Sequence, residues 1–185
     1  GVVLAQFILS QPPPLGEAAG TRSWEGLRVL ELGSGTGLSG LAAAAVGAEV
    51  LLTDRAPLLS LLQLNTDLNA EALRRARGQA ACAAYDWLEP PPACVLRERD
   101  LVIAADVVYA FAAVEPFANA LASVLVESQG HHSAGGGGAP LAVYAHNPRS
   151  PDLDKEMHRA LAARGLQARE VPRSRAAAAA PVGRV

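Results

Sequence analysis

The stretch VLELGSGTGLSG, residues 29–40, decides the fold of this 185-residue chain. Residues 29–32 form a short apolar run that is typical of a buried strand, and the glycine-rich run 33–37 follows directly. The Ala-rich residues 38–46 then predict a helix. A strand that turns through glycines into a helix N-terminus is a common device for holding a nucleotide-like ligand, because glycine lets the backbone approach the ligand closely.

The spacing of the glycines excludes two common nucleotide-binding motifs. A dinucleotide fingerprint reads G-x-G-x-x-G, but Leu38 stands at the position of its third glycine. A P-loop is excluded because no Gly-Lys-Ser/Thr follows. The run is instead E-x-G-x-G-x-G, with Glu31 two residues before Gly33.

A second acidic residue follows at the end of the next predicted strand. Gly47 is expected to end the preceding helix, and residues 49–53 predict a strand that ends at Asp54. A carboxylate there can accept hydrogen bonds from both hydroxyls of a ribose. Alternatively, Asp54 caps the helix that begins near Pro57, and the two roles are compatible.

Composition indicates one globular domain over residues 1–185. The chain is 50% hydrophobic and carries a net charge of -2, which gives no general attraction to nucleic acid. It has neither an apolar run of the roughly 20 residues that cross a membrane nor a secretory signal pattern, so we expect a soluble, cytoplasmic protein. Cys82 and Cys94 have no metal-ligand spacing, and we expect them to be reduced and no metal site to be present.

Strand and helix patterns alternate along the chain. We expect strands at 28–32, 49–53, 81–85, 101–105, 140–145 and 166–171, and helices at 2–9, 38–46, 57–68, 111–126 and 152–164. This alternation predicts an α/β fold with a Rossmann-like, doubly wound, mostly parallel sheet, whose ligands lie at the carboxyl ends of the strands. We also expect Arg74, Arg75 and Arg77 at a solvated helix end, a flexible Gly-rich loop at 130–138 and a tail at 173–185.

Two further strand ends carry candidate residues. Asp86 could accept a hydrogen bond from an adenine amino group, and Trp87 could lie on the face of the ring. Alternatively, Trp87 is a core anchor and Asp86 a turn residue. The fourth strand ends in Ala105, followed by Asp106 and, three residues later, Tyr109.

These motifs together resemble the class I, seven-stranded S-adenosylmethionine-dependent methyltransferases, and among them the family 16 protein methyltransferases, which are mostly protein-lysine enzymes. The matching segments are GVVLAQF at 1–7, the run 31–37, Thr53 to Arg55, Asn65, Asn69, Asp86-Trp87 and DLVIAADVVY at 100–109. Residues 139–150 are also similar to the elongation-factor-2 lysine methyltransferases, which carry Arg-Asn-Pro after strand five, although His146 stands here in place of the arginine.

The resemblance implies S-adenosyl-L-methionine as the cofactor and a lysine side chain of a protein as the methyl acceptor. The implied cofactor-binding residues are Glu31, Gly33, Ser34, Gly35, Thr36, Gly37, Asp54, Arg55, Asp86, Trp87 and Ala105. Asp106 is expected to orient the amine, and Tyr109 to form part of the channel wall. The implied partner is a protein substrate, such as a translation factor or a chaperone, with no nucleic acid, no membrane and a monomeric state.

Two alternatives to this function stay open. The methyl acceptor could be another protein side chain or a small molecule, or the chain could be a catalytically silent domain that binds a cofactor or a partner. The silent alternative rests on the ends of the sequence, because the family has an aromatic-containing segment before the stretch at 1–7 and a last, antiparallel strand. Neither is visible here, so we expect either a fragment without the last strand or a remnant of that strand at 181–185.

Overall fold

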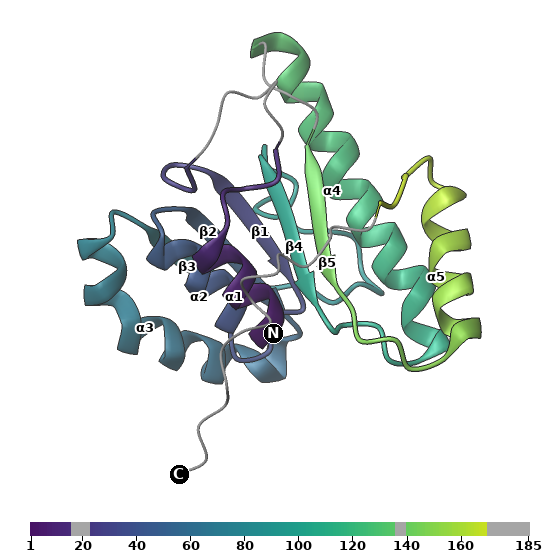
Figure 1. The fold of residues 1–185 in the computed structure, drawn as a ribbon, viewed down its shortest axis with the longest axis horizontal. Helices are drawn as coiled ribbons and strands as arrows, with labels where there is room; N and C mark the ends of the chain where they lie inside the picture. Colours follow the sequence, from purple (N-terminus) through teal and green to yellow (C-terminus); the bar gives the residue numbers. More distant parts are fainter. Residues whose placement is uncertain (16–22, 136–139, 170–185) are drawn as a thin grey trace.

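The computed structural model describes residues 1–15, 23–135 and 140–169, with the backbone alone for 128–135. Within these residues, five strands form one sheet in the order β3-β2-β1-β4-β5, and every neighbouring pair is parallel. The strands are β1 (Arg28–Leu32), β2 (Glu49–Asp54), β3 (Gln79–Ala84), β4 (Leu101–Ala105) and β5 (Leu141–Ala145). The predicted doubly wound parallel sheet is therefore confirmed (Figure 1).

Helices connect the strands and cover both faces of the sheet (Figure 1). They are α1 (Val2–Ser10), α2 (Leu38–Ala45), α3 (Leu59–Arg75), α4 (Val114–Gly135) and α5 (Pro151–Ala162), with the 3-10 turns η2 (Ala56–Leu58) and η3 (Phe111–Ala113) before α3 and α4. None of the described helices combines the length and the apolar character that a membrane span requires.

Two apolar cores lie on opposite faces of the sheet. Side chains of α1, α2 and α3 pack on one face, and side chains of α4 and α5 pack on the other. In β4, Leu101 and Ile103 point into the first core, while Val102 and Ala104 point into the second. Because both faces are covered, β4 reads in the sequence as a continuous apolar run, which made it predictable.

The topology places the candidate residues at one edge of the sheet. The chain winds from β1 to β2 and β3 on one side, and then to β4 and β5 on the other. All strands are parallel, so the loops that follow them lie at the same edge, which is the lower edge in Figure 1. The winding changes direction between β1 and β4, and ligands of such sheets bind beside this point.

Three sequence-based expectations about secondary structure are wrong. Helix α3 continues to Arg75, beyond the predicted end at residue 68, and α4 continues to Gly135, so residues 130–135 of the expected loop are helical. The predicted strand at 166–171 is absent from residues 166–169. Leu166 instead closes the end of α5, where its N–H donates to the Leu161 carbonyl (3.1 Å) and its side chain packs against the core. Residues 136–138, 170–171 and the predicted tail lie outside the described residues.

Candidate cofactor and substrate site

The loop between β1 and α2 has three glycines in the left-handed region, with φ of 68° at Gly33, 55° at Gly35 and 82° at Gly37. Gly33 has no room for a side chain, because a Cβ would lie 2.7 Å from the Val107 side chain and 3.2 Å from the Trp87 ring. At Gly35 a Cβ would meet nothing within 4 Å. The loop is therefore packed against the protein at its start and open at its centre, where a ligand can approach the backbone.

Asp54, the last residue of β2, holds this loop. The Gly35 N–H donates to Asp54 Oδ2 and the Arg55 N–H donates to Oδ1, each at 2.7 Å. Each carboxylate oxygen has a second lone pair, so both can accept a further hydrogen bond. The alternative role as a helix cap is not seen, because the N-cap of η2 is Arg55 and no side chain caps it. The geometry fits the predicted contact with two ribose hydroxyls.

The other two loop residues also bond to their surroundings. The Ser34 N–H donates to the Thr53 carbonyl (2.9 Å), which fixes the loop to β2. The Thr36 carbonyl accepts a hydrogen bond from Asn65 Nδ2 (2.9 Å), which comes from α3. Strand β2 and helix α3 therefore hold the loop in one conformation, as suits a preformed cofactor site.

A hollow of about 340 Å³ lies at the carboxyl ends of β2 and β3, lined by Arg55, Ala56, Pro57, Ala84, Tyr85, Asp86, Glu89, Pro90 and Pro92. Two predicted cofactor residues, Arg55 and Asp86, belong to its wall. Asp86 also accepts a hydrogen bond from the Leu88 N–H (3.1 Å), so its alternative role as a turn residue is observed. A contact of Asp86 with adenine stays a prediction.

Trp87 lies behind the glycine loop. Its ring packs against Phe117 of α4, with centroids 5.3 Å apart, and closes the sheet side of Gly33. The structure thus shows the core-anchor role that was the alternative interpretation of Trp87. Its contact with the cofactor remains a prediction.

Asp106 lies directly after Ala105, the end of β4. Its backbone has φ of 54°, and its N–H donates to the Ala145 carbonyl at the end of β5 (2.8 Å). Oδ2 accepts a hydrogen bond from Arg149 Nη2 (2.7 Å). Oδ1 is buried and has no hydrogen-bond partner among the described residues. Tyr109 is 64% exposed, so its ring stands at the surface, and its place in a channel wall stays a prediction.

Comparison with known proteins assigns the chain to a family. A sequence profile described as "Lysine methyltransferase" matches residues 1–132. The chain belongs to the lysine methyltransferase family. It is 34% identical over 102 residues to the protein-lysine N-methyltransferase rrg1 of Schizosaccharomyces pombe, which covers 50% of this chain and 34% of rrg1.

Two other relatives match a similar part of the chain. The protein N-lysine methyltransferase METTL21A of Danio rerio is 40% identical over 85 residues, which covers 46% of this chain and 38% of the relative. The EEF1A lysine methyltransferase 3 of Mus musculus is 37% identical over 86 residues, which covers 46% of this chain and 35% of the relative. The matches therefore span only about a third of the length of each of these relatives.

Membership of the lysine methyltransferase family confirms the predicted family and its class I fold. The cofactor of this class is S-adenosyl-L-methionine, as predicted. The residues present fit it in two respects, namely the open space at Gly35 and the second lone pairs of the Asp54 carboxylate. No cluster of His, Cys, Asp or Glu that could hold a metal occurs in the part of the chain that the structure describes.

Glu31 of the family's glycine motif is buried beneath the loop and only 2% exposed. Its Oε2 accepts a hydrogen bond from the Gly40 N–H in α2 (3.1 Å), and this bond and the nearby Ser34 and Ser39 hydroxyls act to lower its pKa. Burial raises the pKa of Glu31 from its ordinary 4.5 to about 7. Glu31 therefore supports the loop from below, and direct contact with the cofactor stays a prediction.

The raised pKa of Glu31 predicts a pH-dependent stability. Between pH 4.5 and 7 the folded chain holds a proton on Glu31 that the unfolded chain has lost, so this group makes stability fall as pH rises through that range. The Glu31→Gln variant lacks this contribution. We expect its free energy of unfolding, relative to the wild type, to increase by about 3 kcal/mol between pH 4 and pH 8. Urea unfolding at both pH values measures this, and a relative stability that does not change with pH contradicts it.

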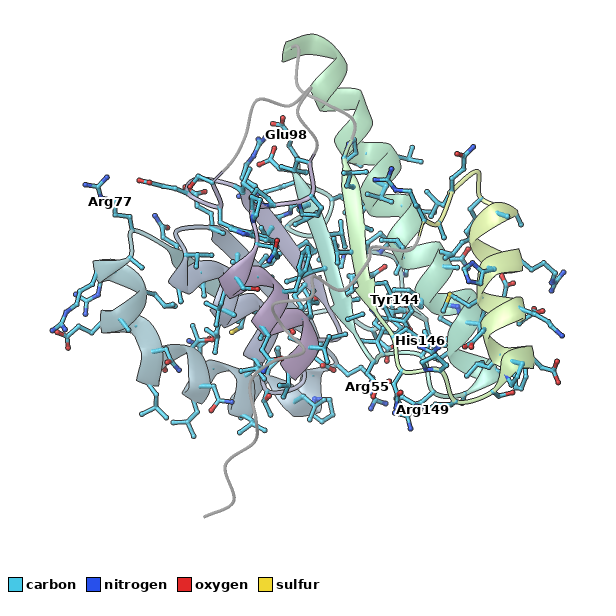
Figure 2. All side chains as sticks on the ribbon, in the orientation of Figure 1. Arg55, Arg77, Glu98, Tyr144, His146 and Arg149 are labelled. Atoms are coloured by element: carbon cyan, nitrogen blue, oxygen red, sulfur yellow. The ribbon has the colours of Figure 1, made fainter. Side chains whose placement is uncertain are left out.

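A chain of three polar side chains at the end of β5 was missed by the sequence-based analysis. The Tyr144 hydroxyl lies 3.1 Å from His146 Nδ1, and His146 Nε2 lies 2.6 Å from Asp154 Oδ1 in α5 (Figure 2). Burial raises the pKa of Tyr144 to about 12, while a hydrogen bond from the Val108 backbone acts against the rise. These three side chains thus link the segment between Asp106 and Tyr109 to α5. The departure at His146 from the related Arg-Asn-Pro pattern was its only signal in the sequence.

Proposed function

We propose that this chain transfers a methyl group from S-adenosyl-L-methionine to a lysine side chain of a protein. The single observation that carries the proposal is the placement of Asp106 at the end of β4, the strand that pairs directly with β1 and hence lies beside the glycine loop. A carboxylate here is next to the point where the winding changes direction, and family membership supplies the type of reaction.

In the proposed reaction the chain must first hold the cofactor in one orientation. Asp54 would accept hydrogen bonds from the ribose hydroxyls, and the open backbone around Gly35 would support the cofactor. The bound cofactor supplies an electrophilic methyl group on a positively charged sulfur. Arg55 and Asp86 border the hollow at the carboxyl ends of β2 and β3, which would receive the adenine end.

The chain must also prepare the lysine. An alkylammonium group with a pKa of about 10.4 has no lone pair with which to attack, so the site must favour the neutral amine. Exclusion of water and the nearby positive sulfur both do so. Asp106 orients the amine through a hydrogen bond, and correct positioning lowers the barrier to transfer.

Exposed aromatic side chains beside Asp106 are suited to a protein substrate. Tyr109 is 64% and Phe111 is 58% exposed, and both follow the end of β4 within six residues of it. A substrate segment that covers these rings would exclude water from the amine and would complete a channel around it. A small molecule would not need such a surface, so the exposed rings favour a protein substrate.

The relatives suggest which substrates to test first. The name of the relative from Mus musculus gives EEF1A as its substrate. We infer that the substrate of this chain is a translation factor or a chaperone. We also infer that the enzyme is a monomer and acts in the cytoplasm.

A labelling experiment tests the proposal. The purified chain is incubated with cell lysate and cofactor carrying a tritiated methyl group, and the protein fraction is hydrolysed to amino acids. We expect label in methyl-lysine, and its loss with Asp106→Asn. Label in methyl-histidine or in small metabolites would favour the other acceptors, and an absence of label with bound cofactor would favour the silent domain.

A further inference from the structure

The carboxylate of Asp106 already binds a cation of the chain itself. Arg149 Nη2 donates to Asp106 Oδ2 at 2.7 Å, and the two side chains are 46% and 38% exposed. Oδ1 is buried, so Oδ2 is the oxygen that a group from solvent can reach. Under the proposed function, this same oxygen would receive the amine of the substrate.

We propose that Arg149 is a resident cation that occupies the position of the substrate ammonium on Asp106, and that a lysine side chain must displace it. The inference rests on the proposed function for its biological meaning. The competition between two cations for one carboxylate oxygen, however, is a property of the chain that can be measured without any methyl transfer.

The backbone around Arg149 is held, so displacement requires movement of its side chain alone. Before it, His146 bonds to Asp154 of α5. After it, the Ser150 carbonyl accepts the Asp154 N–H (3.1 Å). Pro148 and Pro151 each fix a backbone φ within this short loop. The half-exposed guanidinium has room to rotate into solvent while the loop stays in place.

The strength of the pair suits an exchange. Ion pairs with this degree of exposure are weak, because water screens both charges and a long side chain must be held in one rotamer. An incoming ammonium brings the same charge and also donates hydrogen bonds. A cation that is delivered by a bound protein surface can therefore replace the guanidinium, whereas a free amine in solution must compete with a partner that is always present.

The expected consequence is selectivity for a lysine on a protein over free amines. Asp106 is covered by Arg149 until a substrate surface presents a lysine at this point, so unattached amines in the cell are poor competitors. Removal of the guanidinium should open Asp106 to simple amines. The geometry thus points to Arg149 as a specificity residue for amines that are presented by a protein.

A titration with n-butylammonium chloride tests this inference, because this ion mimics the end of a lysine side chain. Amide NMR spectra of the wild type, Arg149→Gln and Arg149→Lys are recorded at fixed low ionic strength. We expect Arg149→Gln to bind the probe about fivefold more tightly than the wild type, with shifts centred on residues 105–109. Arg149→Lys keeps the charge and should retain the wild-type affinity.

Two further variants complete the experiment. Asp106→Asn alone should bind the probe no better than the wild type, and its combination with Arg149→Gln should abolish the gain in affinity, because the carboxylate is the binding group. Equal or weaker binding of the probe by a folded Arg149→Gln variant overturns the inference. Calorimetry with S-adenosylhomocysteine on the wild type and each variant separates the two proposals. If the wild type did not bind this ligand, the proposed function would be refuted, while the result on cation exchange would stand.

Discussion

Replacement of Asp106 by asparagine is expected to lower the rate of methyl transfer by about a hundredfold or more, while the affinity for S-adenosylhomocysteine stays within about twofold of the wild type. The carboxylate orients the amine, and an amide carries no charge to hold it. Asparagine is preferred to alanine here, because Asp106 has φ of 54°, a conformation that asparagine adopts more readily than alanine does. Transfer of labelled methyl to the identified substrate and calorimetry measure the two effects.

Asp152→Asn is the matched control for the Asp106 variant. Asp152 is an exposed acid in the first turn of α5 whose partner is Lys155, so its replacement changes the net charge equally and leaves Asp106 intact. We expect its activity to lie within about twofold of the wild type. If the Asp106 variant turned over as fast as this control, the proposed orienting role would be wrong.

Replacement of Asp54 by alanine is expected to weaken binding of S-adenosylhomocysteine by about a hundredfold. The variant loses hydrogen bonds from the ribose to a charged acceptor, which contribute roughly 1.5–3 kcal/mol each. It also releases the Gly35 N–H, which Asp54 holds at 2.7 Å, so the loop loses one of its supports. Calorimetric titration of both proteins measures the difference.

Asp67→Asn provides the comparison for Asp54. This residue lies on α3, and its carboxylate accepts a hydrogen bond from Gln63 (2.8 Å), one turn away on the same helix. Its replacement removes the same charge at a distance from the glycine loop, so we expect no change in the affinity for S-adenosylhomocysteine. Wild-type affinity in a folded Asp54→Ala variant would show that the carboxylate does not bind the ribose.

The strands that decide the fold could be predicted from the sequence because both of their faces are buried. β1 and β4 begin and end at the predicted residues, since both are short, mostly apolar runs whose two faces are covered. The prediction of a strand at 166–171 was wrong because an apolar residue after a helix can either pair in the sheet or pack at the end of that helix. Leu166 packs at the end of α5 instead of pairing in the sheet, and this choice depends on contacts that the sequence does not display.

The length of α4 was underestimated for a related reason. Glycine and histidine near residue 130 suggested a loop, yet the sequence has no proline between residues 117 and 139, and the helix continues to Gly135. Glycine lowers the helix propensity only by about 1 kcal/mol. A single weak residue is therefore poor grounds for ending a helix that is already packed against a sheet.

For the site, the sequence identified residues that stand at strand ends and missed the partners that reach them from elsewhere. The glycine loop, Asp54 and Asp106 follow strands that could be located. Arg149 lies 43 residues beyond Asp106, and its bond to that carboxylate depends on the path of the loop after β5. Such pairings depend on the tertiary structure, and no local sequence pattern predicts them.

A crystal structure of the chain with S-adenosylhomocysteine tests the central claim most directly, because it shows which residues contact each part of the ligand. We predict the ribose hydroxyls on Asp54, the adenine at the hollow bordered by Arg55 and Asp86, and the sulfur directed toward Asp106. A ligand bound away from the glycine loop, or with its sulfur directed away from Asp106, would contradict the account.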